Sequence, residues 1–261
     1  MIIGAQLYTV REQCQTPEDM KRTLAAVREI GYTCVQLSGH NLAIPFATIA
    51  GWCRDLGLSV GSTHTSYQRM LEDLPGVIAD HKMLGCPYPG IGGMPGKYTT
   101  SAEGYAAFAA EVAPIAKKMR DEGLTFIYHN HNHEFIRFAT PSGSESGMDI
   151  LLRHAAPDMQ FELDTHWVQA GGASPVAWIE KVKGRCDVVH FKDMVYDAEE
   201  HRGVICEVGS GNLDWPGIFS ACKSSGVKYA FVEQDDEHPK RPRLESLAMS
   251  YAFLKDSGLQ P

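Results

Sequence analysis

Four polar clusters rich in His, Asp and Glu interrupt the apolar segments in the second half of the chain. They read Tyr128-His129-Asn130-His131-Asn132-His133-Glu134, Glu162-Leu163-Asp164-Thr165-His166-Trp167, His190-Phe191-Lys192-Asp193 and Glu233-Gln234-Asp235-Asp236. Charged side chains are costly in buried strands unless a partner binds them. A mixed set of carboxylates and imidazoles suits a divalent ion such as Mn2+, Mg2+, Co2+ or Zn2+. The clusters therefore predict a site for one divalent metal ion.

Each cluster also has a simpler interpretation when it is taken alone. Asp164 could cap a helix, Glu233 could form an ion pair, and His190 could be a hydrogen-bonded core residue. The histidines of residues 129–133 could lie in a solvated loop. The same ligand types recur at the ends of four separate apolar segments, and this recurrence favours the metal site.

The segments that carry the clusters belong to a longer alternation of short apolar strands and amphipathic helices. We expect strands at residues 2–8, 34–38, 59–65, 88–92, 125–131, 160–165, 186–192 and 229–234. The first helix shows its own boundaries, because Thr16 can cap it, Pro17 suits its first position and Gly31 ends it.

Eight such units in 261 residues predict an α/β protein with a single (β/α)8 TIM barrel over residues 1–261. An open doubly wound sheet is the alternative, but no GxGxxG motif follows the first strand. In a barrel, all four clusters would lie at the carboxyl ends of strands, where barrel enzymes place their active sites.

The composition excludes several classes of partner. The net charge of -8 argues against nucleic-acid binding, which needs clustered Lys and Arg. No run of about 18 apolar residues predicts a membrane span. The seven scattered cysteines form no CxxC motif, and the first residues lack signal-peptide features, so we expect a cytoplasmic protein without a catalytic cysteine. A homo-oligomer remains open.

The clusters and their flanking motifs resemble the xylose-isomerase-like barrel superfamily of sugar phosphate isomerases/epimerases. The resemblance covers nearly the whole chain, and the run Tyr128-His129-Asn130-His131 is similar to one subgroup. Further matching motifs are Gln6-Leu7-Tyr8-Thr9-Val10-Arg11, Glu134-Phe135, Glu162-Leu163-Asp164-Thr165 with Trp167, Val189-His190-Phe191-Lys192-Asp193, Glu207-Val208-Gly209-Ser210-Gly211-Asn212-Leu213-Asp214-Trp215 and Val232-Glu233-Gln234-Asp235.

The resemblance implies one divalent ion held by Glu, Asp, His and Glu from strands five to eight. Asp164, His190 and Glu233 match the last three positions. Many relatives carry Glu on strand five where this chain has His129. We expect Glu134, folded back over the metal, to be the fourth ligand, and His129 is the alternative.

The resemblance also implies a reaction on a small sugar or polyol that begins with removal of a proton next to a carbonyl. The metal would stabilise the resulting enediolate. Returning the proton to another carbon or face gives an isomerase or epimerase, which we favour. Expelling a β-substituent gives a dehydratase or lyase acting on keto-sugars or keto-inositols. A non-enzymatic sugar-binding barrel is a further alternative, and a DNA-repair nuclease on this barrel conflicts with the acidic charge.

Several residues are candidates for the individual steps. Glu233 or Glu134 would be the base in an epimerase-like scheme, whereas His129 or His131 could serve here. His129 and His131 are two residues apart, so on a strand they would point to the same side. Lys192, two residues beyond His190, could stabilise an oxyanion.

Other residues could contact the substrate. The candidates are Tyr8, His64, His166 and Trp167, which follow or end predicted strands. The glycine-rich loops Gly90–Gly96 and Gly209–Gly211 could bind a phosphate through backbone N–H groups. Formation of a tight turn is the interpretation that we favour for both loops.

Overall fold

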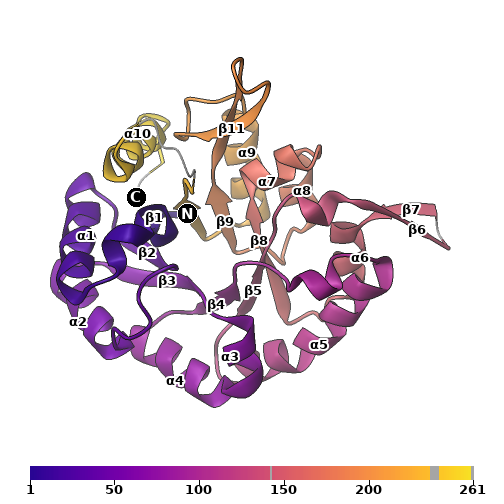
Figure 1. The fold of residues 1–261 in the computed structure, drawn as a ribbon, viewed down its shortest axis with the longest axis horizontal. Coiled ribbons are helices and arrows are strands. Elements are labelled where there is room, and N and C mark those ends of the chain that lie inside the picture. The colour runs from indigo at the N-terminus through magenta and orange to yellow at the C-terminus, as the bar shows by residue number, and fades with distance from the viewer. Residues whose placement is uncertain (142, 236–240, 260–261) are drawn as a thin grey trace.

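Eight parallel strands close into a barrel in the computed structural model, which describes residues 1–141, 143–235 and 241–259 (Figure 1). The strands are β1 (Ile2–Gln6), β2 (Cys34–Leu37), β3 (Ser59–His64), β4 (Tyr88–Ile91), β5 (Phe126–His129), β8 (Met159–Asp164), β9 (Val188–Phe191) and β12 (Tyr229–Val232). Around the barrel they follow the order β1-β12-β9-β8-β5-β4-β3-β2. The predicted TIM barrel is therefore confirmed.

Helices surround the strands on the outside (Figure 1). The longer ones are α1 (Pro17–Ile30), α2 (Phe46–Leu56), α4 (Leu74–Leu84), α5 (Ala102–Asp121), α6 (Gly147–His154), α8 (Pro175–Lys181), α9 (Trp215–Ser225) and α10 (Arg243–Asp256). The short helices α3 (Tyr67–Glu72) and α7 (Thr165–Ala170) follow β3 and β8 closely. No helix within the described residues is long and apolar enough to cross a membrane.

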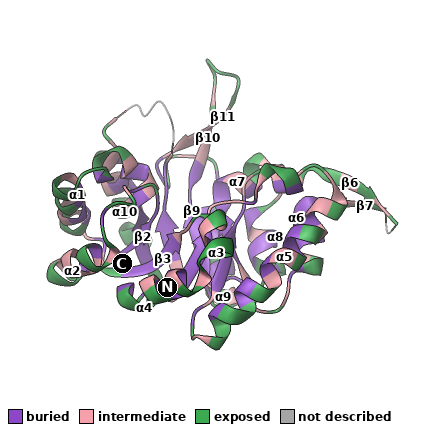
Figure 2. Ribbon diagram, turned by 60° about the horizontal axis from the view of Figure 1, so that its bottom comes forward, coloured by how far each residue is buried: buried purple, intermediate pink, exposed green. Residues whose placement is uncertain are grey.

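The first helix shows why these segments are helical. The Thr16 side chain accepts a hydrogen bond from the N–H of Asp19, and Pro17 occupies the first turn. Met20, Leu24 and Val27 share one face of α1 and are fully buried against the barrel. Figure 2 shows the same division throughout, with buried strands inside and exposed residues on the outer faces of the helices.

The strands are shorter than predicted at their carboxyl ends. The expected strand 2–8 stops at Gln6, and Tyr8 lies in the 3-10 helix η1 (Leu7–Cys14). The Gln6 side chain starts this helix by accepting a hydrogen bond from the N–H of Tyr8. Likewise β5 stops at His129, so His131 lies beyond the strand rather than on it.

Two antiparallel hairpins, neither of which was predicted, extend from the barrel (Figure 2). The first pairs β6 (Arg137–Thr140) with β7 (Gly143–Ser146), and the second pairs β10 (Asp193–Asp197) with β11 (Arg202–Cys206). The β10–β11 hairpin begins one residue after Lys192, so it rises directly from the end of β9 beside the barrel mouth.

Candidate metal and substrate site

Four buried side chains converge at the carboxyl ends of four adjacent strands. His129 and Asp164 end β5 and β8, His190 lies one residue before the end of β9, and Glu233 follows β12. The ligand atoms of these four residues lie within 4.8 Å of one another. His190 Nδ1 lies 3.0 Å from Glu233 Oε2 and 3.8 Å from Asp164 Oδ2. His129 Nε2 lies 3.5 Å from Asp164 Oδ2. We call these residues the four-residue group.

The hydrogen bonding of this group fits a metal ion. Both ring nitrogens of His129 and Asp164 Oδ2 are buried and have no hydrogen-bond partner in the part of the chain that the structure describes. Buried polar atoms are nearly always paired, so His129 Nε2 and Asp164 Oδ2, which lie 3.5 Å apart, are available to bind a cation. Two imidazoles and two carboxylates are a usual donor set for a divalent transition metal. The four-residue group could therefore hold one divalent ion.

Asp164 also caps a helix, so both of its sequence interpretations apply. Its Oδ1 accepts a hydrogen bond of 2.8 Å from the N–H of Trp167 and thereby starts α7. Its Oδ2 faces the four-residue group. The helix thus fixes the rotamer that presents the second oxygen to the site.

Glu134 lies outside the four-residue group, contrary to our expectation that it folds back over the metal. It sits in the 3-10 helix η3 (His133–Phe135), where its carboxylate accepts hydrogen bonds from the Tyr128 hydroxyl at 2.5 Å and the His131 N–H at 2.9 Å. These bonds hold it beside His131 and His133. Burial raises the pKa of Glu134 to about 7. The fourth member of the group is His129, the alternative that the sequence offered.

Lys192 is a fully buried cation beside the four-residue group. Its Nζ lies 3.1 Å from Glu233 Oε2 and 2.8 Å from Asp235 Oδ1, and it approaches the Trp167 ring to 4.9 Å. Burial alone would lower the pKa of Lys192, but the carboxylates of Glu233, Asp164 and Asp235 raise it above its ordinary value. Lys192 therefore stays charged. Asp236, which follows in the same cluster, lies outside the described residues.

The histidines of the site differ in charge. Burial lowers the pKa of His129 well below its ordinary value and lowers that of His131 to about 3. Burial also disfavours charge on His190, but Glu162 and Glu233 outweigh it and raise the pKa of His190 to about 10. His129 and His131 are thus neutral near pH 7, as a ligand or a base must be. Their rings are 5.0 Å apart although His131 is not on the strand.

A second polar network lies deeper in the barrel and was missed by sequence reasoning. Glu162 Oε2 pairs with His64 Nε2 at 2.6 Å, and Glu162 Oε1 accepts a 2.8 Å bond from the Gln36 amide. The signals were a glutamate two residues before Asp164 and a glutamine inside the apolar run of β2. His64, expected at the substrate, is part of this network, and its ring is 5.1 Å from that of His129.

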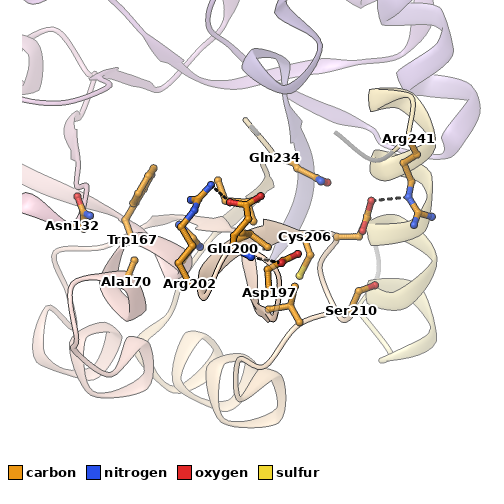
Figure 3. Close-up of a pocket in the computed structure, with 16 residues that line it drawn as sticks. Asn132, Trp167, Ala170, Asp197, Glu200, Arg202, Cys206, Ser210, Gln234 and Arg241 are labelled. Carbon is orange, nitrogen blue, oxygen red and sulfur yellow. Dashed lines mark hydrogen bonds and ion pairs between the residues drawn. The ribbon is translucent and has the colours of Figure 1, made fainter. Parts of the chain in front are cut away.

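A cavity of about 440 Å3 lies along the β10–β11 hairpin, and its lining includes Gln234, the neighbour of Glu233 in the chain, and two residues that closely follow Asp164. Figure 3 shows Trp167, Arg202 and Gln234 among the side chains that line it. His166 lines it as well, and His166 Nδ1, Trp167 Nε1 and Gln234 Oε1 have no partner among the described residues. Of the predicted substrate contacts, His166 and Trp167 meet here, whereas Tyr8 does not line this cavity and packs against Arg11.

The loop Gly209–Gly211 has its N–H groups already engaged. Asp193 Oδ2 accepts hydrogen bonds from Gly209 N at 2.9 Å, Gly211 N at 3.0 Å and Trp215 Nε1 at 2.7 Å. A Cβ on Gly211 would lie 2.3 Å from Asp193 Oδ1, which explains the glycine. The loop therefore fits the turn-forming interpretation better than a phosphate cradle.

Comparison with known proteins places this geometry in a family. A sugar phosphate isomerase/epimerase from Parabacteroides distasonis is 22% identical, with a TM-score of 0.84 over 99% of this chain and 95% of its own. An L-ribulose 3-epimerase is 18% identical, with a TM-score of 0.73 over 98% of this chain and 94% of its own. The probable 3-DHS dehydratase AsbF from Bacillus anthracis is 15% identical, with a TM-score of 0.71 over 98% of this chain and 99% of its own.

At these identities the likeness to solved structures shows the fold alone. No curated protein matches the sequence. The family model described as Xylose isomerase-like TIM barrel, however, matches residues 24–256, which is most of the chain. The chain therefore belongs to the xylose isomerase-like TIM barrel family.

Proposed function

We propose that this protein is a divalent-metal-dependent sugar isomerase or epimerase that removes a proton next to a carbonyl. The observation that carries the proposal is the four-residue group, in which buried ligand-type atoms from four strands converge, close in the chain to residues that line a cavity. Such convergence of perturbed titratable groups at the carboxyl face of a barrel is typical of an active site.

His129, Asp164, His190 and Glu233 would hold the ion, and Glu134 would support the site from outside. When bound, the ion supplies positive charge that stabilises negative charge on a substrate carbonyl oxygen. A divalent ion with two carboxylates and two neutral imidazoles has no net charge, which suits a buried position. His190 must release a proton to become a ligand, because its pKa is raised in the free protein.

His131 is the residue that we assign as the base. It is neutral near pH 7, it is not in the four-residue group, and it is only partly buried at the barrel mouth. Its ring lies 5.0 Å from that of His129 and 5.3 Å from that of Trp167, which lines the cavity. Lys192, which remains protonated, would stabilise developing negative charge and could return a proton.

The cavity sets the size of the substrate. A volume of about 440 Å3 lies within the usual range for small-molecule sites and accommodates one sugar unit. The unpaired His166 Nδ1, Trp167 Nε1 and Gln234 Oε1 could bind substrate hydroxyls. Since the N–H groups of Gly209 and Gly211 are bonded to Asp193, we do not expect the loop Gly209–Gly211 to bind a substrate phosphate.

A dehydratase or lyase on keto-sugars is the second candidate, and one observation favours it. His129 occupies the place where the resemblance would put a second glutamate, so a pair of ligand glutamates does not flank the substrate. A single base, His131, and a single acid, Lys192, suffice to remove a proton and expel a β-hydroxyl group.

Proton NMR in D2O tests the proposal and separates the two candidates. The Mn2+-, Co2+- or Zn2+-loaded protein is screened against keto-sugars and inososes, with product analysis after removal of paramagnetic ions. Deuterium incorporated next to the carbonyl, together with an isomeric product, supports the proposed function. Loss of water supports the dehydratase. A protein that binds these compounds without exchange in any metal form is a binding protein, and the proposal is then wrong.

A further inference from the structure

The polar network beneath the four-residue group contains a carboxylate that has no lysine or arginine partner among the described residues. Glu162, Gln36 and Ser62 are completely buried and lie on β8, β2 and β3. Glu162 is two residues before Asp164 on the same strand, so it points into the barrel one layer deeper. Burying such groups is costly, and apolar side chains would fill a barrel interior equally well. The network therefore calls for a role other than packing.

The hydrogen bonds of this network have only one consistent direction. The backbone carbonyl of Tyr88 cannot donate, so the Ser62 hydroxyl must donate to it at 3.0 Å. Ser62 Oγ, whose proton is used, must then accept the 3.1 Å bond from the Gln36 amide nitrogen. Glu162 Oε1 accepts from the same nitrogen at 2.8 Å. The NH2 group of Gln36 is therefore fixed by two acceptors.

This direction extends to a metal ligand. With its NH2 group held by Ser62 and Glu162, Gln36 presents its carbonyl Oε1 to His190 Nε2 at 2.7 Å. An amide oxygen only accepts, so the Nε2 atom must carry a proton. A neutral imidazole has one N–H group, which leaves the lone pair on Nδ1, the atom that faces Glu233 and Asp164. Glu162 Oε1 also lies 3.2 Å from His190 Nε2 and reinforces the arrangement.

We propose that Gln36 and Glu162 are positioning residues for metal binding, which hold the His190 ring with its Nε2–H directed into the barrel and its Nδ1 lone pair directed at Asp164 and Glu233. Partners of this kind orient a ligating histidine and fix its tautomer. His64 completes the arrangement, because its ring nitrogen binds the other oxygen of Glu162 at 2.6 Å. The inference rests on the proposed metal site and adds two residues from outside it.

The variants Gln36→Leu and Glu162→Gln test the proposal, with Gln6→Leu as a matched control. Gln6 is also fully buried, and it lies directly opposite Gln36 in the register of β1 and β2. Its side chain accepts from Tyr8 N and bonds to none of the network residues. Removing Gln6 therefore makes the same change of side chain in the same layer without touching His190.

The readout is the affinity for Zn2+, measured by competition with a chromogenic chelator, and it does not depend on turnover. Loss of an outer partner of a ligand typically weakens metal binding by about 10–100-fold, and we expect this for Gln36→Leu and Glu162→Gln. Gln6→Leu should keep the wild-type affinity. If Gln36→Leu does not fold, the affinity of Glu162→Gln alone tests the proposal. This variant replaces one oxygen by an NH2 group and keeps the packing volume of the buried side chain.

Long-range 1H–15N NMR of histidine rings gives a second readout in the Zn2+-loaded protein. We expect the proton of His190 on Nε2 and the metal on Nδ1. A metal bound through Nε2, or wild-type affinity in both network variants, would overturn this inference and leave the proposed function intact. A wild-type protein that binds none of the divalent ions would instead refute the proposed function.

Discussion

The two carboxylate oxygens of Asp164 have different contacts, and two substitutions can distinguish the contributions of these contacts. Oδ1 caps α7 by accepting from Trp167 N, and Oδ2 faces the four-residue group. Asp164→Asn keeps an oxygen for the cap but replaces the other oxygen by an NH2 group, which has no lone pair for a metal. Asp164→Ala removes both. Because both variants remove the same negative charge, the difference between them reports mainly on the cap.

The expected magnitudes follow from these contacts. Both variants should lose the metal, and with it the stabilisation by bound ligand, which is about 2.7 kcal/mol at 100 times Kd. Without metal, Asp164→Ala should be less stable than Asp164→Asn by about 0.5–2 kcal/mol, the usual value of an N-cap. For a chain of this size, about 1 kcal/mol corresponds to a Tm difference of about 2–4 °C.

Elemental analysis and calorimetry, with and without chelator, measure the two effects. Ser174→Ala is the control, since Ser174 caps α8 in the same way by accepting from Ala177 N at 3.3 Å but lies outside the site. It should lower Tm and leave the metal content unchanged. The reasoning is refuted if Asp164→Asn retains full metal, or if the metal-free Asn and Ala variants melt at the same temperature.

Three further predictions concern the base, the buried acid and the thiols. His131→Asn should lower turnover by about a hundredfold at full metal content, whereas His133→Asn should have far less effect; equal losses would contradict the assignment. Since burial raises the pKa of Glu134 from 4.5 to about 7, the unfolded chain releases this proton first and stability falls as pH rises between these values. Between these pH values, the free energy of unfolding of Glu134→Gln, measured with urea, should therefore rise by about 3 kcal/mol relative to that of the wild type. A difference that stays constant with pH would refute this prediction. Turnover should not depend on a thiol even at Cys206, the one partly exposed cysteine, whose pKa burial raises to about 12 and which lines the cavity; Cys206→Ser should keep turnover, and its inactivation with fold and metal intact would count against this.

The sequence predicted the barrel because its predicted strands are apolar on both faces and are followed by polar residues at their carboxyl ends. The same polar ends explain why strand boundaries were less accurate. At β5, the residues after His129 leave the strand to face the mouth, and at β1 the Gln6 side chain starts a 3-10 helix. Local pattern does not reveal where a strand stops when its last residues have partners on other strands.

The fourth member of the four-residue group depended on contacts that a linear pattern does not contain. Glu134 matched an acidic ligand by type, but the Tyr128 hydroxyl and the His131 N–H hold it away from the group. The bond between Gln36 and Glu162 joins residues 126 positions apart, so neither residue alone signalled the network. Residue type predicted which strands contribute, and tertiary contacts decided which side chains meet.

The Asp193 carboxylate has a consequence for how substrate range can change within this architecture. It lies at the base of the β10–β11 hairpin, and it also binds the return loop at Gly209 and Gly211 and the ring of Trp215 at the start of α9. The Asp193 carboxylate therefore holds together the two ends of the segment 193–215. We therefore expect that the length and tip of the hairpin between them can change without disturbing the barrel or the four-residue group.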